Sequence, residues 1–302
     1  MRVLTALGGN ALLRRGEPLT AAAQRMNVRA AVQQLAPVAL ENELVVTHGN
    51  GPQIGMLAEE AAAFPGTGGK SLDVLGAKTD GWIGYVIEQE LGNVLPFEKP
   101  LATVLTMVEI DPDDDAFANP QKPIGAVYTE AEARTLADGR GWVVAPDGDG
   151  WRRVVPSPRP LRVFQVRPIE WLLEQGTVVI CAGGGGIPTM YAKDGTLIGA
   201  DVVIDKDRAS ALLARQLDVD VLVLATDVAG VYVDWRGPNE RLIGRTTPDE
   251  LETLELPPGS MGAKVDAART FTAETGRPSV IGSLDRLADL VRLEAGTVIL
   301  PE

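Results

Sequence analysis

Short apolar segments with the composition of buried strands alternate with helical segments along most of the chain. These apolar segments are nearly continuous and rich in Val, Ile and Leu, and they cover residues 3–7, 43–48, 102–110, 177–183, 221–226 and 278–283. Such strands have to be covered on both faces, as in a parallel sheet that lies between two layers of helices. The sequence therefore predicts an α/β protein with a mainly parallel central sheet and helices on both of its faces.

The segments between these strands carry apolar residues at helical spacing. Val28, Ala31, Val32 and Leu35 follow the i, i+3, i+4, i+7 pattern, and Pro37 is expected to kink or end that helix. Further helices are predicted over residues 52–63, 72–91, 165–175, 205–218, 261–275 and 284–295.

Residues 111–160 interrupt this alternation. They contain Asp113-Asp114-Asp115, several prolines and glycines, and short polar turns such as residues 147–150. Structureless loops of this length are rare in compact domains, so we expect a small inserted subdomain that acts as a lid. Two lobes are predicted: residues 1–170, which include this subdomain at about 111–160, and residues 171–302.

Charge and composition argue against several classes of function. The 302-residue chain has a net charge of −13 and no basic run, which argues against a nucleic-acid partner or an anionic membrane surface. No apolar run approaches the roughly 20 residues that span a bilayer. His48 is the only histidine, so a metal site built from several histidines is excluded. Cys181 is the only cysteine, which suits a cytoplasmic protein, and we expect both residues to have structural roles.

Three of the predicted strands end in glycine-rich turns. These turns contain Gly8-Gly9-Asn10, Gly49-Asn50-Gly51 and the glycine run 183–186. Glycine lets backbone N–H groups approach an anion closely, and the N-terminus of a following helix adds a favourable dipole. The carboxyl ends of parallel strands form one edge of the sheet, where ligands bind. One such turn could be an ordinary strand–helix connection, but three together predict a cradle for a phosphate or a carboxylate.

Three lysines lie in glycine- or proline-rich surroundings. They are Lys122 in NPQKPIG, Lys206 in IDKDRAS and Lys264 in GSMGAK. Each lysine alone could be a solvated surface charge, and Asp205 or Asp207 could simply cap the helix that follows. In an acidic chain, however, three such lysines together with the glycine turns favour a multiply anionic ligand. The combination points to phosphoryl transfer.

Two common nucleotide-binding patterns are incomplete. Residues 66–71 (GTGGKS) resemble the end of a P-loop, but the full motif needs glycine where the chain has Phe64, and the segment follows a predicted helix. The glycine run 183–186 lacks the third glycine of the dinucleotide-binding fingerprint, because Thr189 occupies that position. Neither a P-loop NTPase nor a Rossmann oxidoreductase is supported.

Seven strings resemble carbamate kinase, a family with the amino-acid-kinase fold. They are ALGGNAL (6–12), VTHGNGPQIG (46–55), NPQKPIG (119–125), GWRRVVPSPRP (150–160), ICAGGGGIP (180–188), VIDKDRASALLA (203–214) and GSMGAKVDAA (259–268). The resemblance implies a three-layer sandwich and ATP-dependent phosphoryl transfer between carbamate and carbamoyl phosphate. It also implies Mg²⁺, with ATP or ADP as co-substrate, in a cytoplasmic homodimer of arginine metabolism that works mostly toward ATP synthesis.

The resemblance further implies roles for individual residues. Lys206 and Lys264 would hold the transferring phosphoryl group, Asp207 would orient them and order the metal through water, and Lys122 would reach in from the lid. The first lobe would hold carbamate or carbamoyl phosphate through Gly8, Gly9, Asn10, Gly49, Asn50 and Gly51. Gly184 and Gly185, which belong to the second lobe, would also bind substrate or phosphate. The second lobe would bind the nucleotide through Asp205, Lys206, Asp227, Tyr232, Met261 and Lys264.

Two positions depart from the family pattern. Ala263 occupies the place of a proline before Lys264, and Asp80 occupies the place of a glutamine. The sequence leaves open whether Asp80 faces the site. It also leaves open a related kinase that phosphorylates bicarbonate, an acyl carboxylate or a small phosphonate. A catalytically silent binding protein of the same fold is the other alternative, although the three lysines argue against it.

Overall fold

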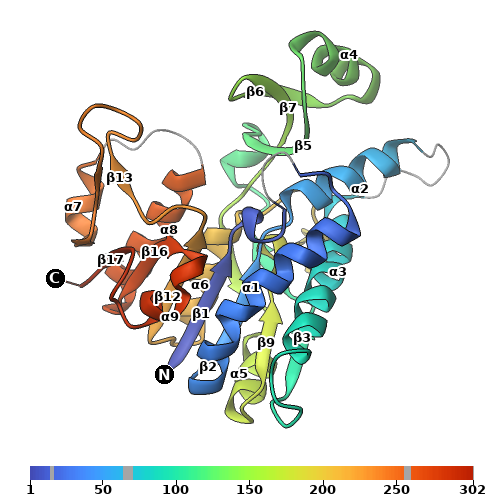
Figure 1. Cartoon of the computed structure of the whole chain (residues 1–302). Helices are drawn as coiled ribbons and strands as arrows, with labels where there is room; N and C mark the ends of the chain where they lie inside the picture. Colours follow the sequence, from blue (N-terminus) through green and yellow to red (C-terminus); the bar gives the residue numbers. More distant parts are fainter. Residues whose placement is uncertain (14–16, 64–70, 255–259, 302) are drawn as a thin grey trace.

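The computed structural model describes residues 1–13, 17–63, 71–254 and 260–301. Most of the P-loop-like segment and Gly259 therefore lie outside the described residues. Within the described ranges, an eight-stranded sheet forms the centre of the molecule (Figure 1). Its strand order is β15-β17-β16-β12-β1-β2-β9-β3, and neighbouring strands are parallel except for β16 and β17. The predicted mainly parallel sheet is confirmed.

The strands of this sheet match most of the predicted apolar segments. They are β1 (Arg2–Leu7), β2 (Glu43–His48), β3 (Leu101–Val104), β9 (Val178–Cys181), β12 (Val221–Thr226), β15 (Arg245–Thr246), β16 (Ser279–Ser283) and β17 (Thr297–Ile299). The short strands β15 and β17 were not predicted. β9 lies between β2 and β3, so the sheet is continuous through both halves of the chain.

Alternate strand residues point to opposite faces of the sheet and build two separate cores. Leu4 and Ala6 of β1 pack in one core with α5 (Val166–Glu174), α6 (Lys206–Gln216) and α8 (Ser260–Thr275). Val3 and Leu7 pack in the other core with α1 (Ala21–Glu41), α3 (Leu72–Gly92) and α9 (Leu287–Val291). Each fully buried Val, Leu or Ile stabilises the fold by about 1.5–3 kcal/mol. The result is the expected three-layer arrangement.

Pro37 lies within α1 and does not end it, since the helix runs on to Glu41. A proline within a helix removes one backbone hydrogen bond and costs roughly 3 kcal/mol. Leu35, Val38 and Ala39 lie on either side of it and are buried in the core. Their burial outweighs the local cost.

The predicted strand over residues 102–110 is two strands in two different sheets. β3 belongs to the central sheet, whereas β4 (Met107–Ile110) belongs to a four-stranded sheet with β8 (Pro160–Val163), β10 (Ile187–Tyr191) and β11 (Leu197–Gly199). The chain leaves the first sheet at Thr106, whose hydroxyl donates a hydrogen bond to the Val104 carbonyl and whose backbone N–H donates to Asp80.

The last predicted helix, over residues 284–295, is shorter than expected. A 3₁₀ turn covers Leu284–Arg286, and α9 ends at Val291. Leu293 has a left-handed backbone with φ of 61°. That conformation commonly stops an α-helix.

The insertion forms a small sheet with one helix. Strands β5 (Lys122–Tyr128), β7 (Gly150–Val155) and β6 (Val143–Asp147) are antiparallel in that order, and α4 (Glu130–Arg140) connects β5 to β6. A reciprocal capping box between Thr129 and Glu132 begins α4. Figure 1 shows this unit at the top, away from the central sheet. At its base, Ile124 and Val155 pack with Ile54 of α2 (Gly51–Ala63).

None of the helices within the described ranges is both long enough and apolar enough to cross a membrane.

Candidate active site

The glycine turns and the three lysines meet in one cleft at the carboxyl ends of the parallel strands. This cleft has a volume of about 1760 Å³. The predicted site residues that line it are Gly8, Gly9, Gly49, Asn50, Gly51, Lys122, Gly184, Asp205, Lys206, Asp207, Asp227 and Lys264. Residues far apart in the sequence are thus brought together where an α/β sheet usually binds its ligand.

Three predicted site residues stand apart from this group, and a fourth, Asn10, is described only in its backbone. Tyr232 lies on β13 (Tyr232–Val233) beside Trp235, with ring centroids 4.9 Å apart, and does not line the cleft within the described chain. Met261 packs against the core at the start of α8. Gly185 does not line the cleft within the described chain, and it packs against the backbone of Ile204. The backbone of Asn10 belongs to a 3₁₀ turn, and its side chain lies outside what the structure describes.

The N-terminus of α6 is fixed by Asp205. Its Oδ1 accepts hydrogen bonds from the backbone N–H groups of Asp207 (2.9 Å) and Arg208 (3.2 Å), so the carboxylate caps the helix. Its Oδ2 accepts from the ammonium of Lys122, which comes from β5 of the insertion. Burial raises the pKa of Asp205, but the charge and hydrogen bond of Lys122 outweigh burial and hold the pKa well below its ordinary value. Asp205 therefore joins the insertion to the central fold.

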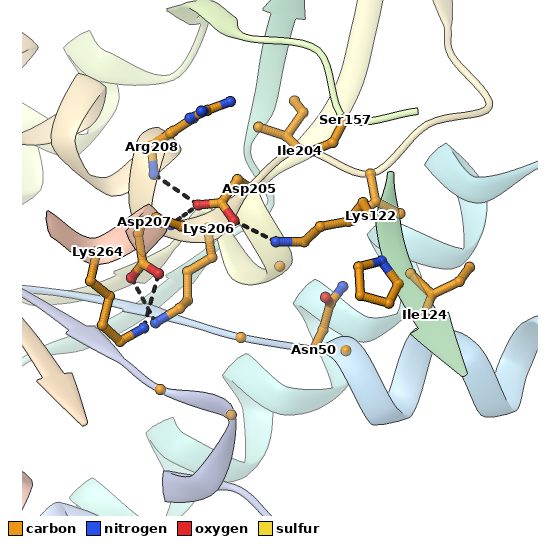
Figure 2. Close-up of a pocket in the computed structure, with 18 of the residues that line it drawn as sticks. Asn50, Lys122, Ile124, Ser157, Ile204, Asp205, Lys206, Asp207, Arg208 and Lys264 are labelled. Atoms are coloured by element: carbon orange, nitrogen blue, oxygen red, sulfur yellow. Dashed lines mark hydrogen bonds and ion pairs between the residues drawn. The ribbon is translucent and has the colours of Figure 1, made fainter. Parts of the chain in front are cut away.

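Lys206 and Lys264 converge on the carboxylate of Asp207 (Figure 2). Lys206 Nζ lies 3.0 Å from Asp207 Oδ1, and Lys264 Nζ donates to Oδ2 at 2.9 Å. Burial raises the pKa of Asp207, but the two ammonium charges outweigh burial and hold the pKa below its ordinary value. The carboxylate is therefore ionised. An ammonium has three N–H donors, so each lysine keeps donors for a phosphoryl oxygen.

The charge on Lys206 is sensitive to its surroundings. Burial lowers its pKa from 10.5 to about 8, with Asp207 acting in the opposite direction and Lys264 adding to the decrease. The lysine is therefore largely protonated at neutral pH but loses its proton under mildly alkaline conditions.

Two glycine turns allow backbone and lysine to lie close together. A Cβ on Gly49 would lie 3.4 Å from the backbone nitrogen of Gly9 and 3.7 Å from Cδ of Lys206. The turns after β1 and β2 thus border the lysine pair. α2 begins at Gly51, so its N-terminal N–H groups also face this region and favour an anion.

The side chain of Asn50 is fixed between α3 and the third glycine turn. Its Nδ2 donates to Thr79 Oγ1 at 2.8 Å. A Cβ on Gly184 would lie only 2.0 Å from the same nitrogen. Only glycine fits at position 184, because any side chain would displace Asn50.

Among the residues that the structure describes, three arginines line the cleft that the sequence did not predict as site residues. Arg152 pairs with Asp147 at 3.1 Å and donates to the carbonyl of Gly125 at 2.8 Å. Arg208 pairs with Asp266 at 3.4 Å, and Arg159 follows the PSP string. Arg208 directly follows Asp207, and Arg152 and Arg159 lie within a string that resembles the family, so position in a motif was the available signal.

The single histidine and cysteine are buried away from the cleft. Burial lowers the pKa of His48 to about 4, and its Nδ1 contacts the Gly49 carbonyl at 3.0 Å. The neutral ring therefore donates Nδ1–H to that carbonyl. Cys181 is fully buried in β9, and burial raises the pKa of its thiol.

The two departures from the family pattern differ in position. Ala263 lies in the first turn of α8 and lines the cleft beside Lys264. Asp80 does not face the cleft: it is fully buried in α3, and its carboxylate accepts backbone N–H groups of Gly183 and Thr106.

Known proteins match the chain over its whole length. The model of the amino acid kinase family matches residues 1–283. A carbamate kinase from Haemophilus influenzae is 56% identical, over 99% of this chain and 96% of its own length. The structure of a Giardia lamblia carbamate kinase bound to citric acid superposes with a TM-score of 0.93 at 38% identity, covering 100% of this chain and 98% of that one. The Giardia enzyme bound to AMP-PNP gives a TM-score of 0.89 at 38% identity with the same coverage. Agreement of this extent in sequence and in structure shows that the chain belongs to the amino acid kinase family, among the carbamate kinases.

Proposed function

We propose that the chain transfers a phosphoryl group between ATP and carbamate, giving ADP and carbamoyl phosphate, and that it works mainly toward ATP synthesis. The observation that carries this proposal is the pair of buried ammonium groups of Lys206 and Lys264 on Asp207, at the edge of the sheet where three glycine turns meet. The full-length similarity to enzymes named carbamate kinase supports the choice of acceptor.

The chemistry requires charge stabilisation more than proton transfer. The attacking oxygen of carbamate is already anionic, so no general base has to remove a proton. In the transition state, negative charge spreads over the oxygens of the transferring group, and fixed cations and N–H groups stabilise it. Lys206, Lys264 and the backbone around Gly9 and Gly49 supply such groups. One preorganised donor of this kind is worth about 3 kcal/mol in the barrier.

Lys122 is proposed to contact the small substrate. It enters the cleft from β5 of the insertion and pairs with Asp205, which caps the helix that carries Lys206. Carbamoyl phosphate in the cleft would compete with Asp205 for this ammonium. The remaining contacts to the small substrate are assigned to the glycine turns of the first lobe, residues 1–170.

The nucleotide is proposed to bind to the second lobe, residues 171–302. Asp205, Asp207, Asp227 and Lys264 border the cleft there, and Asp227 follows β12 directly. The AMP-PNP complex of the Giardia enzyme supports an ATP or ADP co-substrate. The roles of Tyr232 and Met261 rest on the family resemblance, because neither borders the cleft.

The residues present fit Mg²⁺ that arrives with the nucleotide. Within the described residues, no three or more His, Cys, Asp or Glu side chains are grouped to hold a metal. Mg²⁺ commonly binds one or two carboxylates, substrate phosphates and water, so it does not need such a cluster. Asp207, already paired with two lysines, would contact the ion through water. The bound ion would neutralise charge on the phosphates.

The remaining features of the proposal rest on the family resemblance alone. They are a homodimer, a cytoplasmic location and a place in arginine metabolism. Sedimentation or light scattering of the purified protein measures the first of these directly.

The reaction is tested by following ATP formation from ADP and carbamoyl phosphate, with and without Mg²⁺. We expect Mg²⁺-dependent ATP formation, and its absence would contradict the proposal. In the reverse direction, ADP release is compared for carbamate, bicarbonate, acetate and a small phosphonate. Preference for one of the last three would favour a related kinase, and nucleotide binding without turnover would favour a silent binding protein.

A further inference from the structure

Asp80 joins two backbone segments beneath the active-site cleft. It is fully buried in α3, with Oδ1 accepting from the N–H of Gly183 at 2.8 Å and Oδ2 accepting from the N–H of Thr106 at 3.2 Å. The hydroxyl of Thr106 in turn accepts from the N–H of Ala182 at 3.0 Å. A carboxylate and a hydroxyl therefore hold the start of the third glycine turn, residues 182–186.

This turn needs such support because much of its backbone is left-handed. The φ values are 50° at Ala182, 66° at Gly184, 93° at Gly185 and 84° at Gly186. Ala182 carries a Cβ, which makes this conformation unfavourable by about 1–2 kcal/mol. Backbone of this kind persists only where its surroundings hold it.

The turn separates the two sides of the proposed phosphoryl site. On one side Gly184 lies against the amide of Asn50, and on the other a Cβ on Gly185 would lie 2.5 Å from the carbonyl oxygen of Ile204. Ile204 directly precedes Asp205, which caps the helix that begins at Lys206. Displacement of the turn would therefore move Asn50 relative to Lys206.

We infer that Asp80 is a positioning residue for phosphoryl transfer, which fixes the glycine turn and through it the separation of Asn50 from the start of α6. The inference rests on the proposed roles of Asn50 and Lys206. Asp80 does not line the cleft, so it acts through the backbone N–H groups of Gly183 and Thr106.

Among the described residues, none of the other titratable groups that face Asp80 changes its charge near neutral pH. His48 of β2 lies with Nε2 3.9 Å from Asp80 Oδ1 and is neutral because burial lowers its pKa to about 4. Cys181 of β9 stays protonated because burial raises its pKa. Charged side chains of α1, Arg25 and Arg29, pair instead with Glu90, ten residues further along α3.

Protonation of Asp80 would loosen the turn. Burial raises its pKa from 3.8 to about 7, against the two backbone N–H groups, which lower it. Above this pH both carboxylate oxygens are full acceptors for Gly183 and Thr106. Below it one oxygen carries a proton and becomes a poor acceptor. Turnover should accordingly fall as the pH decreases through about 7.

The inference is tested with the full chain by comparing kcat, KM and their pH profiles for wild type, Asp80→Asn and Asp80→Gln. Asp80→Asn keeps the shape but loses one acceptor, and we expect kcat to fall by about tenfold to a hundredfold, as for a small misplacement of reacting groups. The KM for ADP should change far less. Asp80→Gln carries the residue of the family pattern and should fold; it should recover turnover relative to Asp80→Asn but lack the inflection near pH 7.

Glu90→Gln is the matched control, because Glu90 is another buried carboxylate of α3 and lies away from the cleft. It should lower the melting temperature while leaving kcat and the inflection near pH 7 in place. Wild-type kcat in Asp80→Asn, or an inflection near pH 7 that persists in Asp80→Gln, would overturn the inference.

A second measurement does not depend on the substrate. The backbone amide resonance of Gly183, followed by NMR, should titrate near pH 7 in wild type and should not titrate in Asp80→Gln. An amide that is insensitive to pH in wild type would overturn the inference even if no turnover were found. Absence of carbamoyl-phosphate-dependent turnover in wild type would instead refute the proposed reaction, so the two failures are distinguishable.

Discussion

At the scale of single residues, Asp207 carries the charge balance of the site. It is 4% exposed and is shared by two lysine ammonium groups, which would repel each other without it. Breaking a buried ion pair by removing one partner costs roughly 3–5 kcal/mol, because the remaining charge is left uncompensated. The arrangement keeps two buried cations close together before any substrate phosphate is present.

Lys206 should set the alkaline limit of activity. Its pKa is lowered to about 8 by burial, so its positive charge is present below this pH and is lost as the pH rises through it. We expect kcat/KM for carbamoyl phosphate to fall above about pH 8. Together with the decrease below about pH 7 that Asp80 predicts, the profile should be bell-shaped.

Lys206→Arg separates this cause from others, because a guanidinium stays charged over the whole range. Its activity should be lower than that of wild type but should show no decrease near pH 8. A Lys206→Arg profile with the wild-type alkaline inflection would assign that inflection to another group.

At the scale of elements, the insertion is held closely against α2. A Cβ on Gly55 of α2 would lie 2.0 Å from Cα of Gly125 in β5, and the hydroxyl of Tyr128 donates to Glu59 at 2.7 Å. Gly125 itself has a φ of 77°, which favours glycine. These contacts fix the strand that carries Lys122 over the cleft.

Gly55→Ala should therefore move the start of β5 and withdraw Lys122 from the cleft. We expect a higher KM for carbamoyl phosphate, a nearly unchanged KM for ADP, and the same pattern in Lys122→Ala. Gly139→Ala is the matched control, because Gly139 lies in α4 with open space around it. A change confined to the KM for ADP in either variant would contradict the proposed role of the insertion.

At the scale of the whole molecule, the sequence predicts the layers better than the connections between them. Val3 and Leu4 pack in two different cores. The sequence predicts this arrangement because each strand is apolar on both faces. The position of β9 between β2 and β3 cannot be predicted from the sequence, because local composition does not determine which strands pair. The break at Thr106 depends on a hydrogen bond that its backbone N–H donates to Asp80, which is distant in the sequence.

The same distinction applies to the candidate site. Lys122, Lys206, Lys264 and the glycine turns stand in recognisable strings, and the fold gathers them in one cleft. The location of Asp80 could not be predicted, because its burial depends on how α3 packs beneath the turn after β9. Tyr232 shows the opposite case, since a residue that matches the family pattern lies outside the cleft.

The most direct test of the paired-lysine site is kcat for ATP formation from ADP and carbamoyl phosphate in Lys206→Met and Lys264→Met. Each substitution removes one cation and keeps most of the side-chain volume. We predict that each lowers kcat by about 10²–10³-fold, the loss typical of one preorganised donor to a developing charge. Lys193→Met, at an exposed lysine, should leave kcat unchanged. Near-wild-type turnover in both site variants would contradict the assignment of phosphoryl transfer to this pair.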